Sequence, residues 1–319
     1  MDAAPIENVL RLRLEISYDG TDFSGWAIQP RLRTVAGELT DALQMVLRHP
    51  VRLVVAGRTD AGVHASGQVA HVDVDTDALL ALTPRRRPGA PDDVVNLQAD
   101  LPADLASGLP ADLPAASNGL LRRLAGVLPP DVRVRAVAPA APGFDARFSA
   151  LRRHYRYRIG TAEWGVEPAD RAFVLARRRP LDAEAMALAA SALIGLRDFA
   201  AFCRPREGAS TVRDLQELSV RRFGDEVQID VTADAFCHSM VRALVGSLIS
   251  VGELRFPVGR PAALQAAGER SAEIHVAAAH GLTLLAVDYP PVAELAARAK
   301  ITRAHRGVGD SPGSPDDLR

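Results

Sequence analysis

Three polar side chains with catalytic potential, those of Arg58, Asp60 and His64, lie among glycines in the segment AGRTDAGVHASGQVAHVD. An ionised carboxylate on such a loop can act as a base or as a nucleophile, and a nearby arginine can keep it ionised and oriented. The structural alternative is a turn aspartate that hydrogen-bonds its own backbone. Catalytic groups are commonly carried on loops that a rigid scaffold holds, so we interpret residues 56–73 as a catalytic loop with its flanks.

A metal site is the second chemistry that this loop could support. Asp60 and His64 could both be ligands, but no third ligand is apparent nearby in the sequence. A metal-dependent hydrolase is therefore an alternative function, whereas the preferred interpretation expects no metal. His64 is interpreted as a structural residue or as a hydrogen-bonding group of the loop.

Regular elements are expected on both sides of the loop. Residues 10–18 alternate apolar and polar side chains, which predicts a half-buried strand. Apolar residues at helical spacing predict a helix over residues 35–47, with Thr34 as its N-cap. Residues 51–56 and 68–75 are typical of two paired strands, so the loop would connect them.

The second half of the chain repeats this order of elements. Residues 154–160 and 282–289 predict strands, and residues 215–233 predict two strands joined at a Gly-Asp turn. Helices are expected over residues 182–194 and 238–252. Strands mixed with separate helices indicate an α+β fold with antiparallel sheet rather than a doubly wound fold.

Two related α+β halves are expected, residues 1–145 and residues 146–290. Residues 79–116 are rich in Pro, Ala and Asp and have no steady period, which predicts a flexible surface insert in the first half. Residues 291–319 are predicted to form a flexible tail.

Composition describes an ordinary globular protein of 319 residues with 48% apolar content. The first residues lack the pattern of a secretory signal, and no apolar run is long enough for a membrane span. Cys203 and Cys237 are far apart and fit no C-x-x-C pattern, which favours reduced thiols in a cytoplasm over a disulfide or a zinc site.

Charge is unevenly distributed, although the net charge is only −1. That net charge argues by itself against a nucleic-acid binder. Residues 147–158, however, contain five arginines and no acidic residue. Local fields can guide a polyanion, so this segment predicts a basic cleft.

Five blocks in the same order resemble the tRNA pseudouridine synthase A (TruA) family. One is the catalytic-loop segment, and the others are YDGTDFSGWAIQP, FDARFSALRRHYRYRI, DAFCHSMVRALVGSLISVG and GLTLLAVDYP. Together they span about residues 9 to 290, apart from the insert. The chain departs from the family pattern in its longer insert, in His154 where Arg is common, and in Cys237 where a histidine or small polar residue is frequent.

The resemblance implies a role for five residues. Asp60 would be the catalytic nucleophile, and Arg58 would pair with it and help to fill the space that the flipped base vacates. Tyr155 would stack on that base, whereas Tyr157 is assigned to packing. Arg242 would be a partner of the Asp60 carboxylate or of the RNA backbone, and Leu282 would line the uracil pocket.

The resemblance also implies an activity and partners. Family enzymes isomerise uridine to pseudouridine at positions 38, 39 and 40 in the anticodon stem and loop of tRNA, and they use no cofactor and no metal. The expected fold is the pseudouridine synthase fold, with two halves whose mixed, largely antiparallel sheets join around a central basic cleft. A cytoplasmic homodimer gripping the anticodon arm is expected. The runner-up is a tRNA-binding protein or RNA chaperone of this fold with little catalysis.

Overall fold

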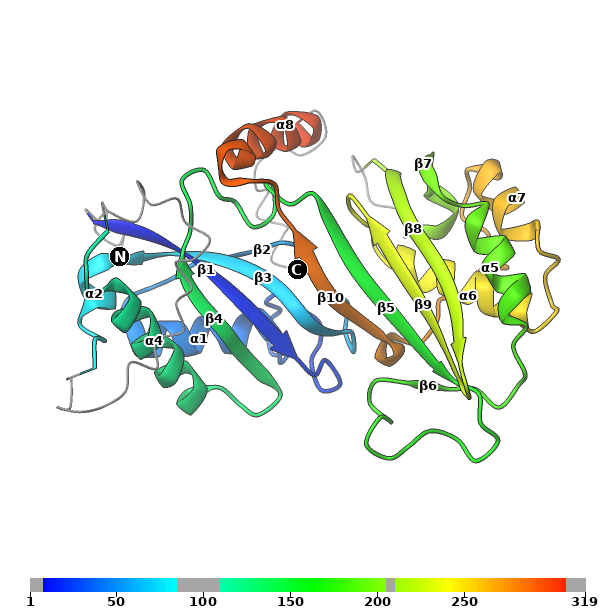
Figure 1. Ribbon diagram of the computed structural model, residues 1–319, viewed down its shortest axis with the longest axis horizontal. Helices are drawn as coiled ribbons and strands as arrows, with labels where there is room; N and C mark the ends of the chain where they lie inside the picture. The colour runs from blue at the N-terminus through cyan, green and yellow to red at the C-terminus, as the bar shows by residue number, and fades with distance from the viewer. Residues whose placement is uncertain (1–7, 85–108, 205–209, 308–319) are drawn as a thin grey trace.

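A single mixed sheet of ten described strands runs through both halves of the chain (Figure 1). The computed structural model describes residues 8–84, 109–204 and 210–307. The strands are β1 Val9–Tyr18, β2 Leu53–Val55, β3 His64–Asp75, β4 Val132–Pro139, β5 Arg152–Gly160, β6 Leu175–Ala176, β7 Gly195–Asp198, β8 Val212–Phe223, β9 Glu226–Ala233 and β10 Leu282–Asp288. The α-helices are α1 Val35–Leu47, α2 Thr76–Leu80, α4 Leu113–Val127, α5 Ala183–Ser191, α6 Met240–Gly252, α7 Arg260–Ala267 and α8 Leu295–Gly307.

The strand order explains how the two halves become one sheet. It is β4-β1-β3-β10-β5-β9-β8-β7, with β2 paired to β3 and β6 paired to β5. Strands β3 and β10 pair in parallel at Thr283↔His64 and Leu284↔Ala65, and β5 and β6 are also parallel. The remaining pairs are antiparallel. The α+β fold with two joined, largely antiparallel sheets is therefore confirmed.

Alternation along the strands separates a buried face from a polar face. In β1, Leu12, Leu14 and Ile16 are fully buried, whereas Arg13 and Glu15 between them remain partly exposed. Helix α1 begins as expected, because the Thr34 hydroxyl accepts a hydrogen bond from the Gly37 N–H at 3.2 Å. In Figure 1, α1 and α6 lie behind the sheet, one in each half.

The predicted insert was wrong at both of its ends. Helix α2 includes residues 79 and 80, and α4 already begins at Leu113, whose side chain is fully buried. The apolar spacing of Leu120, Leu121, Leu124 and Val127 predicts the later part of α4, but a proline in its first turn hid where the helix begins. Proline is tolerated there because its missing N–H is not needed. Residues 85–108 of the predicted insert lie outside the described residues.

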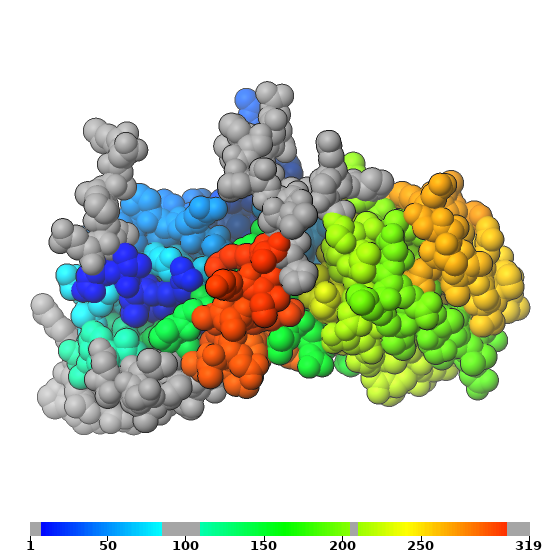
Figure 2. Space-filling view, turned by 90° about the horizontal axis from the view of Figure 1, so that it is seen from above, coloured from blue at the N-terminus to red at the C-terminus, as the bar shows by residue number. Residues whose placement is uncertain are grey.

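The prediction of a flexible tail was also wrong for the part that the structure describes. Residues 295–307 form α8, and Leu295 and Ala299 are almost completely buried. Arg303 of this helix forms an ion pair with Asp145 at 2.6 Å. Seen from above, α8 lies over the middle of the molecule, between its two halves (Figure 2). Among the described helices, none has the length and apolar character that crossing a membrane requires.

Candidate active site

Backbone contacts hold the loop that carries Asp60 against the segment that precedes α1. The Trp26 N–H donates to the carbonyl of Thr59 at 3.0 Å. Gly20 lies so close to the loop that a Cβ there would be 2.1 Å from the carbonyl oxygen of Val63, so no larger residue fits without movement of the backbone. The loop therefore rests on a fixed platform from the first half of the chain.

The Asp60 carboxylate meets three side chains that come from the second half. Arg242 Nη1 lies 3.4 Å from Oδ2, and the Ser239 hydroxyl donates to the same oxygen at 3.4 Å. His238 Nε2 lies 3.6 Å from Oδ1. Arg242 is itself fixed, because its Nε donates to the Ala277 carbonyl at 2.7 Å. The side chain of Asp60 is 30% exposed, so it is held and yet accessible.

The arginine that pairs with Asp60 is not the one expected from the loop sequence. Arg58 is exposed and forms no hydrogen bond or ion pair with any described residue. Its neighbour Thr59 points inward instead, where its hydroxyl lies 2.8 Å from that of Tyr18. Because Thr59 is anchored, Arg58 is directed to solvent. The predicted Arg58–Asp60 pair was wrong, and Arg242 occupies that place.

The two tyrosines of β5 have different surroundings, although both are buried. Tyr155 packs edge-on against Phe236 with ring centroids 5.2 Å apart, and its hydroxyl has no hydrogen-bond partner among the described residues. Tyr157 is fully buried, and its hydroxyl donates to the Ala278 carbonyl at 2.8 Å. Burial raises the pKa of Tyr155, and the nearby negative charge of Asp60 raises it further. The arrangement thus brings Tyr155 near Asp60 and gives Tyr157 the packing position.

Leu282 lies two register positions from Tyr155 on the same sheet. It opens β10, pairs with Tyr157 and is 4% exposed, whereas Leu284 is the residue that pairs with Tyr155. Both leucines belong to the buried apolar core that includes the two tyrosines. The role of Leu282 in a uracil pocket stays a prediction.

His64 has the hydrogen-bonding role that the sequence favoured. Its Nδ1 accepts from the Gly20 N–H at 2.9 Å, and its Nε2 lies 3.0 Å from the His280 carbonyl. An acceptor at Nδ1 requires the proton on Nε2, which then donates to that carbonyl. Burial lowers the pKa of His64, which favours this neutral form. Neither ring nitrogen has a free lone pair, so the arrangement does not support a metal site built on Asp60 and His64.

Most arginines of residues 147–158 do not face the substrate side, contrary to the predicted basic cleft. Strand alternation places three of them on the face of β5 opposite to Tyr155. Their charges are paired there: Arg152–Asp288 at 3.3 Å, Arg156–Asp230 at 2.7 Å and Arg158–Glu226 at 2.7 Å. These three arginines are therefore paired with acids in the structure, and the contact of residues 147–158 with RNA phosphates stays a prediction.

The other two arginines of this segment are linked to each other. Arg153 is buried and donates to three carbonyls, those of Asp234, Ala56 and Arg147. It thereby ties the start of the catalytic loop to β5. Arg147 has no carboxylate partner among the described residues, and its guanidinium lies 5.1 Å from the Phe148 ring centroid.

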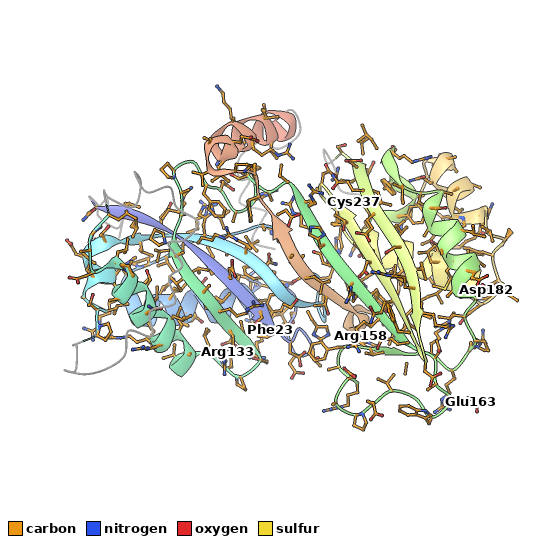
Figure 3. All side chains as sticks on the ribbon, in the orientation of Figure 1. Phe23, Arg133, Arg158, Glu163, Asp182 and Cys237 are labelled. Atoms are coloured by element: carbon orange, nitrogen blue, oxygen red, sulfur yellow. A yellow bond between two sulfur atoms is a disulfide. The ribbon has the colours of Figure 1, made fainter. Side chains whose placement is uncertain are left out.

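The two cysteines are joined in a disulfide, so the expectation of reduced thiols was wrong. Cys203 and Cys237 are separated by 34 positions, but folding brings their Cα atoms to 5.6 Å, a distance that a disulfide spans. Figure 3 shows Cys237 and Arg158 at opposite ends of the β5–β9 pair. The bond fixes the residue directly before His238.

His238 and Ser239 were missed by sequence reasoning. Both precede α6 directly, and Ser239 stands three positions before Arg242, a spacing that places two side chains on the same side of a helix. With Arg242 already singled out as a partner of Asp60, that spacing could have identified Ser239.

Comparison with known proteins agrees with this arrangement. A family model described as tRNA pseudouridine synthase matches residues 189–290. A tRNA pseudouridine synthase A of Frankia casuarinae is 54% identical over 302 residues, which cover 94% of this chain and 97% of the relative. The enzyme of that name from Mycobacterium leprae is 52% identical over 93% of this chain and 96% of its own length. A third, from Corynebacterium glutamicum, is 46% identical over 96% of this chain and 98% of its own.

Similarity to a solved structure is much weaker. A crystal structure of a Cbf5-Nop10-Gar1 complex aligns with a TM-score of 0.29 and 10% identity, over 75% of this chain and 45% of that one. A similarity this low supports no conclusion about this chain. The curated relatives, in contrast, match almost the whole length. This chain belongs to the tRNA pseudouridine synthase A family.

Proposed function

We propose that this protein isomerises uridine to pseudouridine in tRNA, with Asp60 as the catalytic nucleophile. One observation carries the proposal: a partly exposed carboxylate, on a loop fixed by the first half, faces Arg242 of the second half. Because the side chain of Asp60 is held by the second half and is still 30% exposed, it can reach a substrate from a fixed position.

The reaction has simple bond requirements. The bond between N1 of uracil and C1′ of ribose breaks, and a bond between C5 and C1′ forms. A proton leaves C5 and one is taken up at N1, so no oxidant or reductant is consumed. An ionised carboxylate can form a covalent bond to the substrate and release it again, which separates the cleavage from the rejoining step.

Substrate binding is proposed to involve the remaining candidate residues. The target base must leave the stack to reach a carboxylate on a protein loop. The Tyr155 ring would stack on it, and Leu282 would form part of an apolar wall. Burial raises the pKa of Tyr155, so its hydroxyl stays protonated and the side chain stays uncharged at neutral pH. Arg58, whose exposed guanidinium has no partner in the described part of the chain, would contact the RNA.

The finer assignments rest on the motif blocks that this chain shares with its family. We propose that uridines 38, 39 and 40 of the anticodon stem and loop are the targets, and that the enzyme works as a cytoplasmic homodimer. The reaction is proposed to need neither a cofactor nor a metal. The main alternative is a tRNA-binding protein of the same fold with little catalysis.

The test is to map pseudouridine in tRNA with wild-type protein, Asp60→Asn and Asp41→Asn. Asp41 is an exposed residue of α1, which makes it a matched control. We expect pseudouridine at positions 38–40 with the wild type and the control, and a loss of about 10⁴-fold or more in kcat for Asp60→Asn with tRNA affinity retained. Activity of Asp60→Asn within about tenfold of wild type would contradict the assignment. Loss of activity on chelation would instead favour the metal-dependent alternative.

A further inference from the structure

The two oxygens of the Asp60 carboxylate are held unequally. Oδ2 is shared by Arg242 Nη1 and the Ser239 hydroxyl, both at 3.4 Å. Within the described part of the chain, Oδ1 has one polar neighbour at comparable distance, the ring of His238 at 3.6 Å. A carboxylate reacts through one oxygen at a time, and the oxygen with the fewer donors keeps the more reactive lone pairs. Oδ1 is therefore the better nucleophile.

The backbone of His238 is fixed, whereas its ring is left accessible. The Arg204 N–H donates to the His238 carbonyl at 3.0 Å, and the Cys203–Cys237 disulfide ties down the preceding residue. The His238 side chain is 52% exposed, and Asp60 is its one ion-pair partner among the described residues. A distance of 3.6 Å exceeds that of a good hydrogen bond, but such contacts often tighten when the substrate binds.

We infer that Oδ1 is the reacting oxygen of Asp60 and that His238 is the positioning residue that keeps it aimed at the substrate. This inference rests on the proposed function. When this 3.6 Å contact tightens around the substrate, His238 Nε2 donates to Oδ1 and fixes the carboxylate torsion that Arg242 and Ser239 define from Oδ2. The position of the reacting oxygen before the reaction matters, because a misplacement of about 1 Å can lower the rate about 10²-fold.

The test compares His238→Ala, His238→Gln and His275→Ala, with Asp60→Asn measured in parallel. His275 is an exposed histidine remote in sequence from the loop and serves as the control. We expect His238→Ala to lower kcat about tenfold while KM changes less than about twofold, because one aiming hydrogen bond is lost. His238→Gln retains an N–H donor, so it should recover kcat to within about threefold of the wild-type value.

Three outcomes would overturn the inference. The first is a wild-type kcat in His238→Ala. The second is a rise in its KM with kcat unchanged, which would indicate that His238 contacts the RNA instead. The third is a kcat of His238→Gln that is no higher than that of His238→Ala. Melting curves identify any variant that fails to fold. If His238→Ala does not fold, the kcat of His238→Gln decides whether the inference holds. If Asp60→Asn is inactive while His238→Ala is wild type, the inference fails and the proposed function stands. If Asp60→Asn is active, both fail.

Discussion

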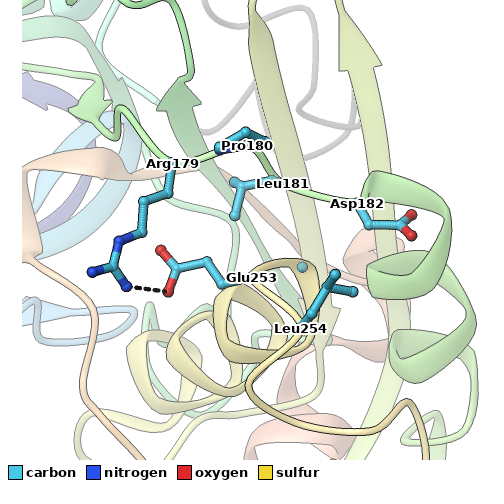
Figure 4. A pocket seen from close by; sticks show the side chains of 7 residues that line it. Arg179, Pro180, Leu181, Asp182, Glu253 and Leu254 are labelled. Atoms are coloured by element: carbon cyan, nitrogen blue, oxygen red, sulfur yellow. Dashed lines mark ion pairs between the residues drawn. The ribbon is translucent and has the colours of Figure 1, made fainter.

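Asp60 and Glu253 are both carboxylates that face arginines, but the arginines satisfy them to very different degrees. Glu253 follows α6 directly, and its side chain is only 2% exposed. Arg177 Nε donates to one of its oxygens at 2.6 Å and Arg255 Nε to the other at 2.8 Å. Arg179 completes the group at 3.9 Å (Figure 4). Both oxygens of Glu253 are therefore occupied by short contacts.

The contrast separates a structural carboxylate from a chemical one. Charge-assisted hydrogen bonds to both oxygens stabilise the anion of Glu253 and leave it no reactive lone pair. A pocket of about 470 Å³ lies beside it and is lined by residues 179–182 and 252–254. Asp60 has longer contacts, one of them from a hydroxyl, and remains 30% exposed. Incomplete pairing is the property that suits Asp60 for catalysis.

Among substitutions of the partners of the two carboxylates, removing Arg242 should have the largest effect, because no second arginine of the described residues pairs with Asp60. We expect Arg242→Gln to lower kcat about 100-fold, since a hydrogen bond to a charged group is worth about 1.5–3 kcal/mol. Arg242→Lys keeps a positive charge and should lose less. Single-turnover rates on tRNA measure this change. Equal rates for Arg242→Gln and wild type would show that the ionisation and aim of Asp60 do not depend on Arg242.

Replacing Glu253 should shift stability and leave chemistry alone. Glu253→Gln removes the charge that three arginines face, so we expect a loss of about 2 kcal/mol in the free energy of unfolding. In a chain of this size that lowers the melting temperature by several degrees. The kcat on tRNA should stay within about twofold of wild type. A large fall in kcat at an unchanged melting temperature would break the distinction between the two carboxylates.

Local patterns predicted the catalytic loop and most of the elements around it. Strict alternation in β1, the N-cap at Thr34 and the Gly-Asp turn after β8 are all properties of a few neighbouring residues, which is why the sequence reveals them. The position of Asp60 between two paired strands follows from the same reasoning. These features needed no knowledge of distant contacts.

Pairings between distant segments were the part that the sequence could not supply. The partner of Asp60 comes from a helix 182 positions further along the chain, whereas the adjacent Arg58 points to solvent because Thr59 is anchored inside. The acids that neutralise Arg156 and Arg158 lie on β9, so a run of arginines in sequence was no basic surface in space. The buried contacts of α8 and the Cys203–Cys237 bond depend on tertiary packing in the same way.

The tyrosines of β5 repeat the contrast between the carboxylates, with a smaller expected effect. The Tyr157 hydroxyl donates to the Ala278 carbonyl, so Tyr157→Phe should cost about 1 kcal/mol of stability and leave kcat unchanged. The Tyr155 hydroxyl has no partner among the described residues, so Tyr155→Phe should leave the melting temperature unchanged. Its ring still stacks on the base, and we expect kcat to fall only severalfold with tRNA affinity retained.

A second substitution decides what the Tyr155 ring contributes. Tyr155→Leu keeps an apolar side chain of similar burial but provides no flat surface, so the stacking free energy of about 1–3 kcal/mol per base is lost. We therefore expect kcat/KM to fall more than in Tyr155→Phe, while kcat/KM of the Tyr157→Phe control stays at the wild-type value. Steady-state kinetics on one tRNA, with melting curves for each variant, measure both quantities. Wild-type turnover by Tyr155→Leu would mean that Tyr155, like Tyr157, only packs.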